Sequence, residues 1–286
     1  MTRARRAAAW LAEKSKRAGP VSRSIAEVVG PLLARGLVRP AVVPPHVRLV
    51  CVGGATFGGS GKSRIAMACA RALEGSILVG HGYCARDRTA RFVDPRESVA
   101  AAGDEALVAA RAGLRVVIAE SRQRAIDFAS RHTDTLVLDG PLAITSPPPR
   151  RLSILALDAD APWGDGRQAP AGDLRAPRDV LLALADEVIH VPRSIDLAAL
   201  PPRPFGLFTA LARPERLIRA LEPDVVVSAP DHGPADARAI SRDVAWVATP
   251  KCALHLEELG VAAHVLRDDF KLTPTWAALT VPRPHE

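Results

Sequence analysis

The chain contains the stretch GGATFGGSGKSR at residues 53–64, whose residue types and spacing are those of a phosphate-binding loop. Gly58, Gly59 and Gly61 allow successive backbone N–H groups to turn toward an anion, and the helix expected after them adds the positive end of its dipole. The signature G-x-x-x-x-G-K-[ST] has glycine where this chain has Thr56. A chance glycine-rich turn is the alternative, but a strand before the loop and a helix after it favour a nucleotide site.

Two further side chains would complete the chemistry of such a loop. Lys62 is placed to reach the β- and γ-phosphates of ATP, and Ser63 to give its hydroxyl to Mg²⁺. A carboxylate at the end of a neighbouring strand is also needed, and Asp139 follows the apolar run TLVL. An aspartate before glycine is often only a turn residue, but beside Lys62 and Ser63 the metal role is the stronger interpretation. The expected nucleotide contacts are Thr56, Gly58, Gly59, Ser60, Gly61, Lys62 and Ser63.

The elements that would position these residues alternate along the chain. A strand is predicted within HVRLVCVGG (46–54) and a helix over KSRIAMACARALEG (62–75). Further strand-like runs are SILVG, LRVVIAE, DTLVLDG, LSILALD and DEVIHVP, with helical patterns such as EALVAARAG and RQRAIDFAS between several of them. This alternation predicts an α/β fold, a P-loop NTPase-like parallel sheet with helices on both faces. Ligands bind such sheets at the carboxyl ends of the strands.

Three regions are expected along the 286 residues. Residues 1–48 form a basic helical arm, residues 49–200 a P-loop core, and residues 201–286 a smaller α/β domain that closes over the cleft. Proline density rises over 192–204, which marks the hinge between the last two regions. In the last region strands are predicted within FGLFTAL, DVVVSAP, DVAWVAT and VAAHVLR, and helices near 213–222, 234–242 and 250–259.

Charge is distributed unevenly. Residues 1–48 hold ten Lys or Arg against Glu13 and Glu27, so this surplus of eight accounts for the whole net charge of +7. A protein whose entire surface binds nucleic acid is excluded, and no obligate protein partner is evident. The apolar runs of the arm are too short to cross a bilayer. The arm is expected either to lie on anionic lipid or to pack as a solvated helix on the domain.

The four cysteines are scattered and form no C-x-x-C pair, which argues against a zinc site and for a reduced cytoplasmic compartment.

Ordered motifs along almost the whole chain resemble the tetraacyldisaccharide 4'-kinase family. VGGATFGGSGKSR is similar to V-G-N-x-T-x-G-G-T-G-K-T-P, which carries threonine where Thr56 stands. GHGY resembles S-R-G-Y, AGDEALVAAR resembles V-G-D-E-P-x-L-x-A, and LDG falls where D-D-G is expected. WGDGRQAPAGDLRAP follows G-N-G-x-L-L-P-A-G-P-L-R-E-P. In the second half, ALARPERLIRALE resembles G-I-(G/A)-x-P-x-R-F, PDHG resembles P-D-H-H, and ATPKCALHL resembles T-E-K-D-A-V-K-L.

The resemblance implies roles for individual residues. Asp104 would activate the sugar hydroxyl with the help of His232, and Lys62 would be the third catalytic residue. Without the resemblance, the sequence favours Asp104 as an N-cap for a helix starting near Glu105 and His232 as a surface turn residue. Glu105 would join the outer shell of the metal.

Two arginines complete the set that the resemblance implies. Arg122 and Arg175 would contact substrate or nucleotide charge.

This chain also departs from the family pattern. The first acid of D-D-G is Leu138, the acid of R-E-P is Ala176, and the second histidine of D-H-H is Gly233. His81 replaces the arginine of S-R-G-Y, and Cys252 the acid of T-E-K-D. Fewer acids around Mg²⁺ are expected to weaken metal binding or slow turnover.

The implied function is an ATP- and Mg²⁺-dependent kinase of the 4'-hydroxyl of the tetraacyldisaccharide 1-phosphate precursor in lipid A biosynthesis. It would work peripherally at the cytoplasmic face of the bacterial inner membrane, docked by its arm. Two alternatives stay open. PLAITS (141–146), which replaces the usual L-Q-H, favours a kinase of another glycolipid; Leu138 and Ala176 favour a nucleotide-binding homologue without transferase activity.

Overall fold

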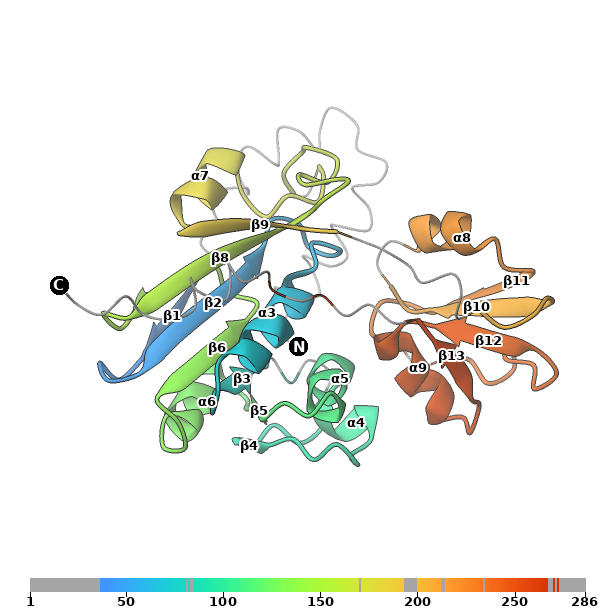
Figure 1. Ribbon diagram of the computed structural model, residues 1–286, viewed down its shortest axis with the longest axis horizontal. Coiled ribbons are helices and arrows are strands. Elements are labelled where there is room, and N and C mark those ends of the chain that lie inside the picture. Colours follow the sequence, from blue (N-terminus) through green and yellow to red (C-terminus); the bar gives the residue numbers. More distant parts are fainter. Residues whose placement is uncertain are drawn as a thin grey trace.

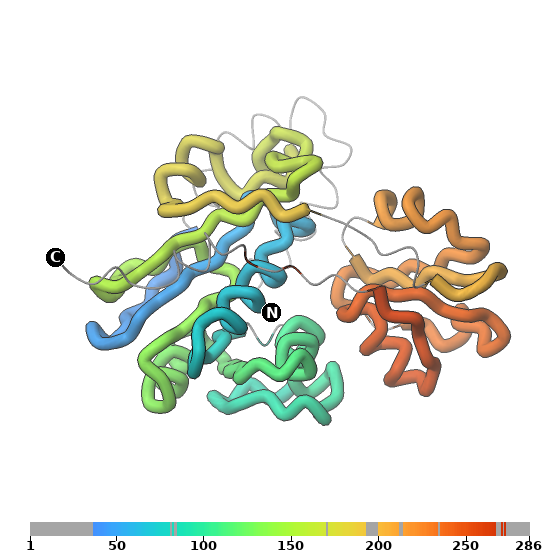
Figure 2. The backbone as a smooth tube through the Cα atoms, in the orientation of Figure 1, coloured from blue at the N-terminus to red at the C-terminus, as the bar shows by residue number. Residues whose placement is uncertain are grey.

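The protein is described here from a computed structural model, in which the chain folds into two bodies (Figure 1). The described residues are 37–80, 82, 85–169, 171–192, 200–211, 214–233, 235–266, 270 and 272. The expected basic arm therefore lies outside them as far as residue 36. Figure 2 shows that the blue-to-yellow part of the chain builds the larger body, and the orange-to-red part the smaller one.

The larger body is built on a seven-stranded sheet with the order β4-β5-β3-β6-β2-β8-β9. Every neighbouring pair is parallel except β4 with β5. The strands are β2 (Arg48–Gly54), β3 (Ile77–Val79), β4 (Arg91–Phe92), β5 (Val116–Ile118), β6 (Thr135–Asp139), β8 (Arg151–Asp158) and β9 (Glu187–Val191). Because β6 pairs directly with β2, their carboxyl ends lie together, with Asp139 opposite Val52.

Helices cover both faces of this sheet. On one face α3 (Lys62–Ala72) and α5 (Asp104–Arg111) bury their apolar sides, and α4 (Val99–Ala102) leads into α5. On the other face lie α6 (Arg122–Ala129) and the two-stranded sheet of β1 (Val38–Val42) with β7 (Ala143–Ser146). A third apolar cluster lies under α7 (Arg178–Ala183).

The smaller body has its own parallel sheet of four strands, in the order β11-β10-β12-β13. Its strands are β10 (Phe205–Thr209), β11 (Val225–Ser228), β12 (Ala245–Ala248) and β13 (Ala263–Val265). The helix α9 (Pro250–Glu257) covers one face over Phe208 and Trp246, and α8 (Glu215–Leu221) covers the other over Phe205 and Leu207. The predicted α/β class, a parallel sheet with helices on both faces plus a smaller α/β unit, is confirmed.

Two local predictions differ from the structure. Residues 38–42, expected in a helical arm, form strand β1, whose valines pair with β7. The helix expected at 234–242 is absent from the described residues 235–242, because the carboxylate of Asp236 accepts from the N–H of Arg238 and closes a turn instead. The PLAITS segment contributes β7, so it serves the small β1–β7 sheet.

Near its end the chain returns to the larger body. Phe270 is buried in the same apolar cluster as α3, and Arg64 stacks over its ring at 5.7 Å from the centroid. Leu272 packs against that cluster as well. These two residues, from the region expected as one domain over 201–286, therefore pack on the larger body. Within the described parts of the chain, no helix combines the length and apolar character needed to cross a lipid bilayer.

Candidate active site

The phosphate-binding loop lies between β2 and α3 and is shaped by its small residues. Gly59 and Gly61 have φ values of +76° and +79°, a left-handed conformation that glycine adopts without the cost a side chain would add. The hydroxyl of Ser60 packs against the backbone of Gly54 so closely that a side chain on Gly54 would clash with it. Thr56 is buried and donates its hydroxyl to the carbonyl of Gly58 at 2.6 Å. The threonine thus closes the loop through its own side chain.

Arg175 supports the same loop from outside. Its Nε donates to the carbonyl of Thr56 at 2.9 Å, and its guanidinium stacks over the ring of Phe57 at 5.0 Å from the centroid. The sequence predicts that this arginine contacts substrate or nucleotide charge. Its described contacts are with the backbone and the phenylalanine of the loop that would bind the phosphates.

Lys62 stands at the centre of a buried group of charges. Its Nζ donates to the hydroxyl of Ser63 at 3.3 Å and lies 3.8 Å from carboxylate oxygens of both Asp139 and Glu105. Burial alone would lower the pKa of Lys62, but the two carboxylates outweigh it, so the pKa is raised and the ammonium stays charged. The pKa of Glu105 is lowered by Lys62, whose charge outweighs the effect of burial.

Asp139 ends strand β6 beside the loop, as the sequence predicts. Its Oδ1 is buried and has no hydrogen-bond partner within the described part of the chain. Burial raises the pKa of this carboxyl, and Lys62 offsets that effect only in part. Arg122, at the start of α6, donates to the backbone carbonyl of Asp139 at 3.1 Å and so holds the strand end in place.

Asp104 and His232 meet across the two bodies. The Nδ1 of His232 lies 2.8 Å and 2.9 Å from the two carboxylate oxygens of Asp104, although 128 residues separate them. Asp104 is the first residue of α5, and the N-cap is Gly103, so the capping role expected for Asp104 is wrong. Its carboxylate accepts from the N–H of Glu105 at 2.8 Å and is otherwise directed at His232.

The backbone at His232 is strained in the way functional sites often are. Its φ is +61°, a left-handed value that costs a side-chain-bearing residue about 1–3 kcal/mol. The next residue, Gly233, donates its N–H to the carbonyl of Pro230 at 2.7 Å, and a Cβ there would lie 2.8 Å from that oxygen. The tight turn therefore excludes a second histidine at this position without a shift of the backbone.

Helix α9 supplies two residues that sequence reasoning missed, Lys251 and His255. Lys251 Nζ lies 2.8 Å from Asp231, 3.3 Å from Nε2 of His232 and 3.7 Å from Asp104. His255 Nε2 lies 3.6 Å from Oδ2 of Asp104. Their four-residue spacing places both on one face of a helix, and this spacing within PKCALHL was the available signal.

The donors around Asp104 determine its ionisation. Burial would raise the pKa of this carboxyl, but the hydrogen bond from His232, the nearby ring of His255 and the charge of Lys251 outweigh burial and hold the pKa well below its usual range. Lys251 donates toward Nε2 of His232, so the partners of the ring assign its proton to Nδ1, facing Asp104.

Two positions where acids were expected lie in apolar cores. Leu138 is fully buried in the cluster behind the sheet, on the face opposite to Asp139 because successive strand residues alternate. Ala176 is fully buried under α7. Cys252 is buried in the smaller body, accepts from the N–H of Ala210 at 3.2 Å, and has its pKa raised by burial. His81 lies outside the described residues.

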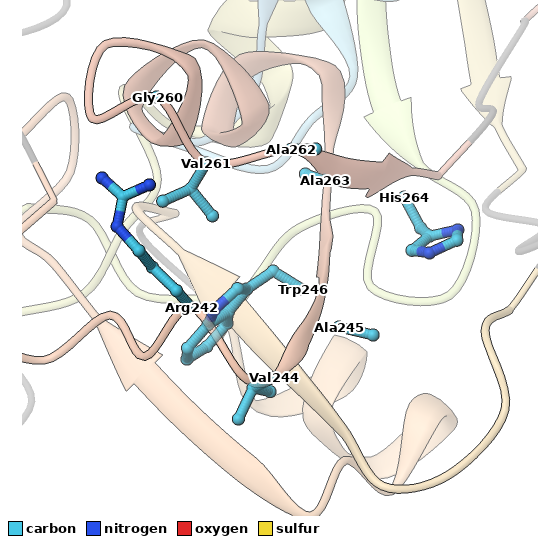
Figure 3. Close-up of a pocket in the computed structure, with 9 residues that line it drawn as sticks. All are labelled: Arg242, Val244, Ala245, Trp246, Gly260, Val261, Ala262, Ala263 and His264. Atoms are coloured by element: carbon cyan, nitrogen blue, oxygen red, sulfur yellow. The ribbon is translucent and has the colours of Figure 1, made fainter.

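A separate pocket of about 440 Å³ lies on the smaller body (Figure 3). It is lined by residues of β12, β13 and the segment after α9, with Arg242 and His264 at its opposite ends. Lys251 lies at the other end of α9 from Gly260 of this pocket. The cluster of charged residues around Lys62 and Asp104 is therefore separate from this pocket.

Comparisons with known proteins agree with this architecture. The family model described as LpxK, Tetraacyldisaccharide-1-P 4'-kinase, matches residues 23–203. A tetraacyldisaccharide 4'-kinase of Gluconacetobacter diazotrophicus is 30% identical over 272 residues, which are 81% of this chain and 82% of that protein. One of Methylorubrum extorquens is 35% identical over 166 residues, and that match spans 55% of this chain but only 50% of the relative. The crystal structure of LpxK from Aquifex aeolicus in complex with ATP shares the fold, with a TM-score of 0.62 at 20% identity over 90% of this chain and 93% of that one.

Proposed function

Since the chain belongs to the tetraacyldisaccharide-1-P 4'-kinase family, we propose that it transfers the γ-phosphoryl group of ATP to the 4'-hydroxyl of the tetraacyldisaccharide 1-phosphate precursor of lipid A. One observation carries the proposal. The Asp104–His232 pair lies next to the phosphate loop, because Glu105, adjacent to Asp104, approaches Lys62 at 3.8 Å. A proton acceptor and a phosphate site are thereby joined in one cluster.

The reaction follows from these positions. The acceptor hydroxyl gives its proton to the Asp104–His232 pair, its oxygen bonds to the γ-phosphorus, and the bond from that phosphorus to the β-phosphate oxygen breaks to leave ADP. Asp104 is ionised at neutral pH, as a proton acceptor must be, and His232 orients it. Lys62 offsets the negative charge of the transferring group, whose loose transition state depends mainly on positioning and electrostatics.

A magnesium ion fits the residues beside the loop. Oδ1 of Asp139, which is buried and has no hydrogen-bond partner within the described residues, and the hydroxyl of Ser63 would hold it, and Glu105 would support its outer shell. Among the described residues no group of three or more His, Cys, Asp or Glu is arranged to hold a metal by itself, which suits an ion that retains waters and phosphate oxygens as ligands. When bound, the ion would neutralise charge on the β- and γ-phosphates.

Transfer of labelled phosphate from ATP to the tetraacyl disaccharide 1-phosphate tests the proposal directly. We expect Mg²⁺-dependent turnover by the wild type, and a loss of about 10²-fold or more in kcat for Lys62→Ala and Asp104→Asn. Asp243→Asn, an exposed carboxylate of the smaller body, is the matched control and should retain activity. Wild-type rates in both site variants would contradict the assignment. Complementation of a strain depleted of its own 4'-kinase then tests the substrate in the cell.

The two alternative functions lose the features that favoured them. PLAITS forms strand β7, and Leu138 and Ala176 lie in apolar clusters. A panel of other glycolipid acceptors with labelled ATP remains the test for a different substrate.

We also propose that the basic arm docks the enzyme on the cytoplasmic face of the bacterial inner membrane. Its charge surplus supports this, since each basic residue near anionic lipid contributes about 1 kcal/mol. The triple change of Arg3, Arg5 and Arg6 to Glu is expected to weaken binding to anionic vesicles at least about tenfold at low salt, with neutral vesicles unaffected. The same change at Arg71, Arg96 and Arg131, exposed on the larger body, is the charge-matched control. Equal losses in both triple variants would refute a specific role for the arm.

A further inference from the structure

His255 is a buried histidine that the reaction described above does not use. It lies in the second turn of α9, between apolar residues that cover the sheet of the smaller body. Neither of its ring nitrogens has a hydrogen-bond partner within the described part of the chain. Leaving buried polar atoms unpaired costs free energy of folding. A residue with only a packing role would avoid that cost.

The ring is aimed at the proposed catalytic carboxylate. Its Nε2 lies 3.6 Å from Oδ2 of Asp104, slightly beyond hydrogen-bond distance. The opposite oxygen, Oδ1, accepts from the backbone N–H of Glu105 at 2.8 Å, and Nδ1 of His232 lies 2.8 Å from Oδ1 and 2.9 Å from Oδ2. Lys251 approaches Oδ2 at 3.7 Å from the same helix face as His255. Oδ2 of Asp104 therefore faces His232 as well as Lys251 and His255 of α9.

We propose that His255 is a positioning residue for this kinase, donating its Nε2–H to Oδ2 of Asp104 when the substrates bind. This rests on the proposed function. With Nδ1 of His232 shared between the two oxygens and His255 donating to Oδ2, rotation of the carboxylate about its Cβ–Cγ bond is restricted. Hydrogen bonds in ligand-free active sites are often long and shorten in the substrate complex, which accounts for the 3.6 Å separation.

A matched pair of substitutions separates positioning from packing. Gln keeps an N–H donor near the place of Nε2, whereas Met has a similar length and no donor. We expect His255→Met to lower kcat at least about tenfold, with the KM for ATP unchanged, and His255→Gln to stay within about threefold of wild type. The Tm of His255→Met should equal or exceed that of the wild type, because two unpaired buried nitrogens are removed.

Outcomes that overturn the proposal are equally specific. Wild-type kcat in His255→Met would show that the donor is not needed. Equal losses in both variants, with a lowered Tm, would assign His255 to packing. Lack of turnover by the wild type would refute the proposed function instead, and a second measurement then decides on His255. The ring ¹⁵N NMR signals of His255 should move on Asp104→Asn and not on Asp243→Asn; unmoved signals would overturn the contact itself.

Discussion

The neighbours of Asp104 keep its carboxyl group ionised. It is buried, yet His232, His255 and Lys251 all direct donors at it, so its pKa is lowered despite burial. A carboxyl with a lowered pKa in the folded state stabilises that state above its unfolded pKa, which is about 3.9. The contribution disappears as the pH falls through the folded value.

The lowered pKa of Asp104 leads to a prediction on stability. Asp104→Asn should have a lower free energy of unfolding than the wild type. This shortfall should be largest at pH 7 and should begin to decrease once the pH drops below about 4. Urea unfolding at a series of pH values measures it, with Asp243→Asn as the control. A shortfall that stays constant from pH 7 to pH 3 would show that the charge of Asp104 does not contribute.

At the scale of elements, the sequence predicted most of what positions the phosphate loop. Apolar runs before Gly53 and before Asp139 indicated two buried strands, and the structure makes them neighbours in the sheet. The meeting of Asp104 with His232 could be expected only from the family resemblance. The sequence around Asp104 and the sequence around His232 do not encode this contact across 128 residues, because the contact depends on how two separate sheets are placed.

The sequence was least informative where a local pattern had two structural outcomes. The segment after His232 is polar and rich in alanine, which suited a helix, but side-chain bonds to the backbone at Asp236 and Ser241 support turns. Leu138 was interpreted as a missing acid near the metal. Its alternation with Asp139 places it on the core face instead.

The loop-to-helix junction allows a test at this scale with two glycines. Gly61 has φ +79°, and a Cβ there would lie 2.8 Å from Val191; Gly75 has φ +71° and nothing within 4 Å. Gly61→Ala is expected to lower the unfolding free energy by about 1–3 kcal/mol and to weaken ATP binding. Gly75→Ala carries only the conformational cost, about 1–2 kcal/mol, with ATP binding intact. Calorimetric titration with ATP compares them, and equal affinities in the two variants would contradict this account of the loop.

At the scale of the molecule, charged contacts join the two bodies outside the site. Arg111 of α5 pairs with Glu257 of α9, and the carboxylate of Glu258 accepts from the N–H of Val99 at 2.9 Å. Elsewhere between the bodies, Arg216 of α8 pairs with Asp158, the last residue of β8, and with Asp160. The arrangement that brings His232 to Asp104 is therefore supported by contacts outside the proposed catalytic pair.

Reversing one of these charges should impair turnover without touching the site. Arg111→Glu places two negative charges together and is expected to lower kcat about three- to tenfold, which corresponds to the energy scale of partly exposed ion pairs. Adding Glu257→Arg should restore most of the rate. Arg124→Glu, which breaks a pair with Glu120 inside the larger body, changes the net charge equally and should have no effect. Failure of the double reversal to recover activity would refute the role of this pair.

The burial of Phe270 in the core of the larger body has a geometric consequence. The chain has left the larger body by β10 and is packed on it again at Phe270, so the smaller body is tied to the larger one at both ends of its own segment. Two ties leave fewer relative orientations open to the smaller body than one tie would. The entropy lost when His232 is brought to Asp104 is reduced accordingly.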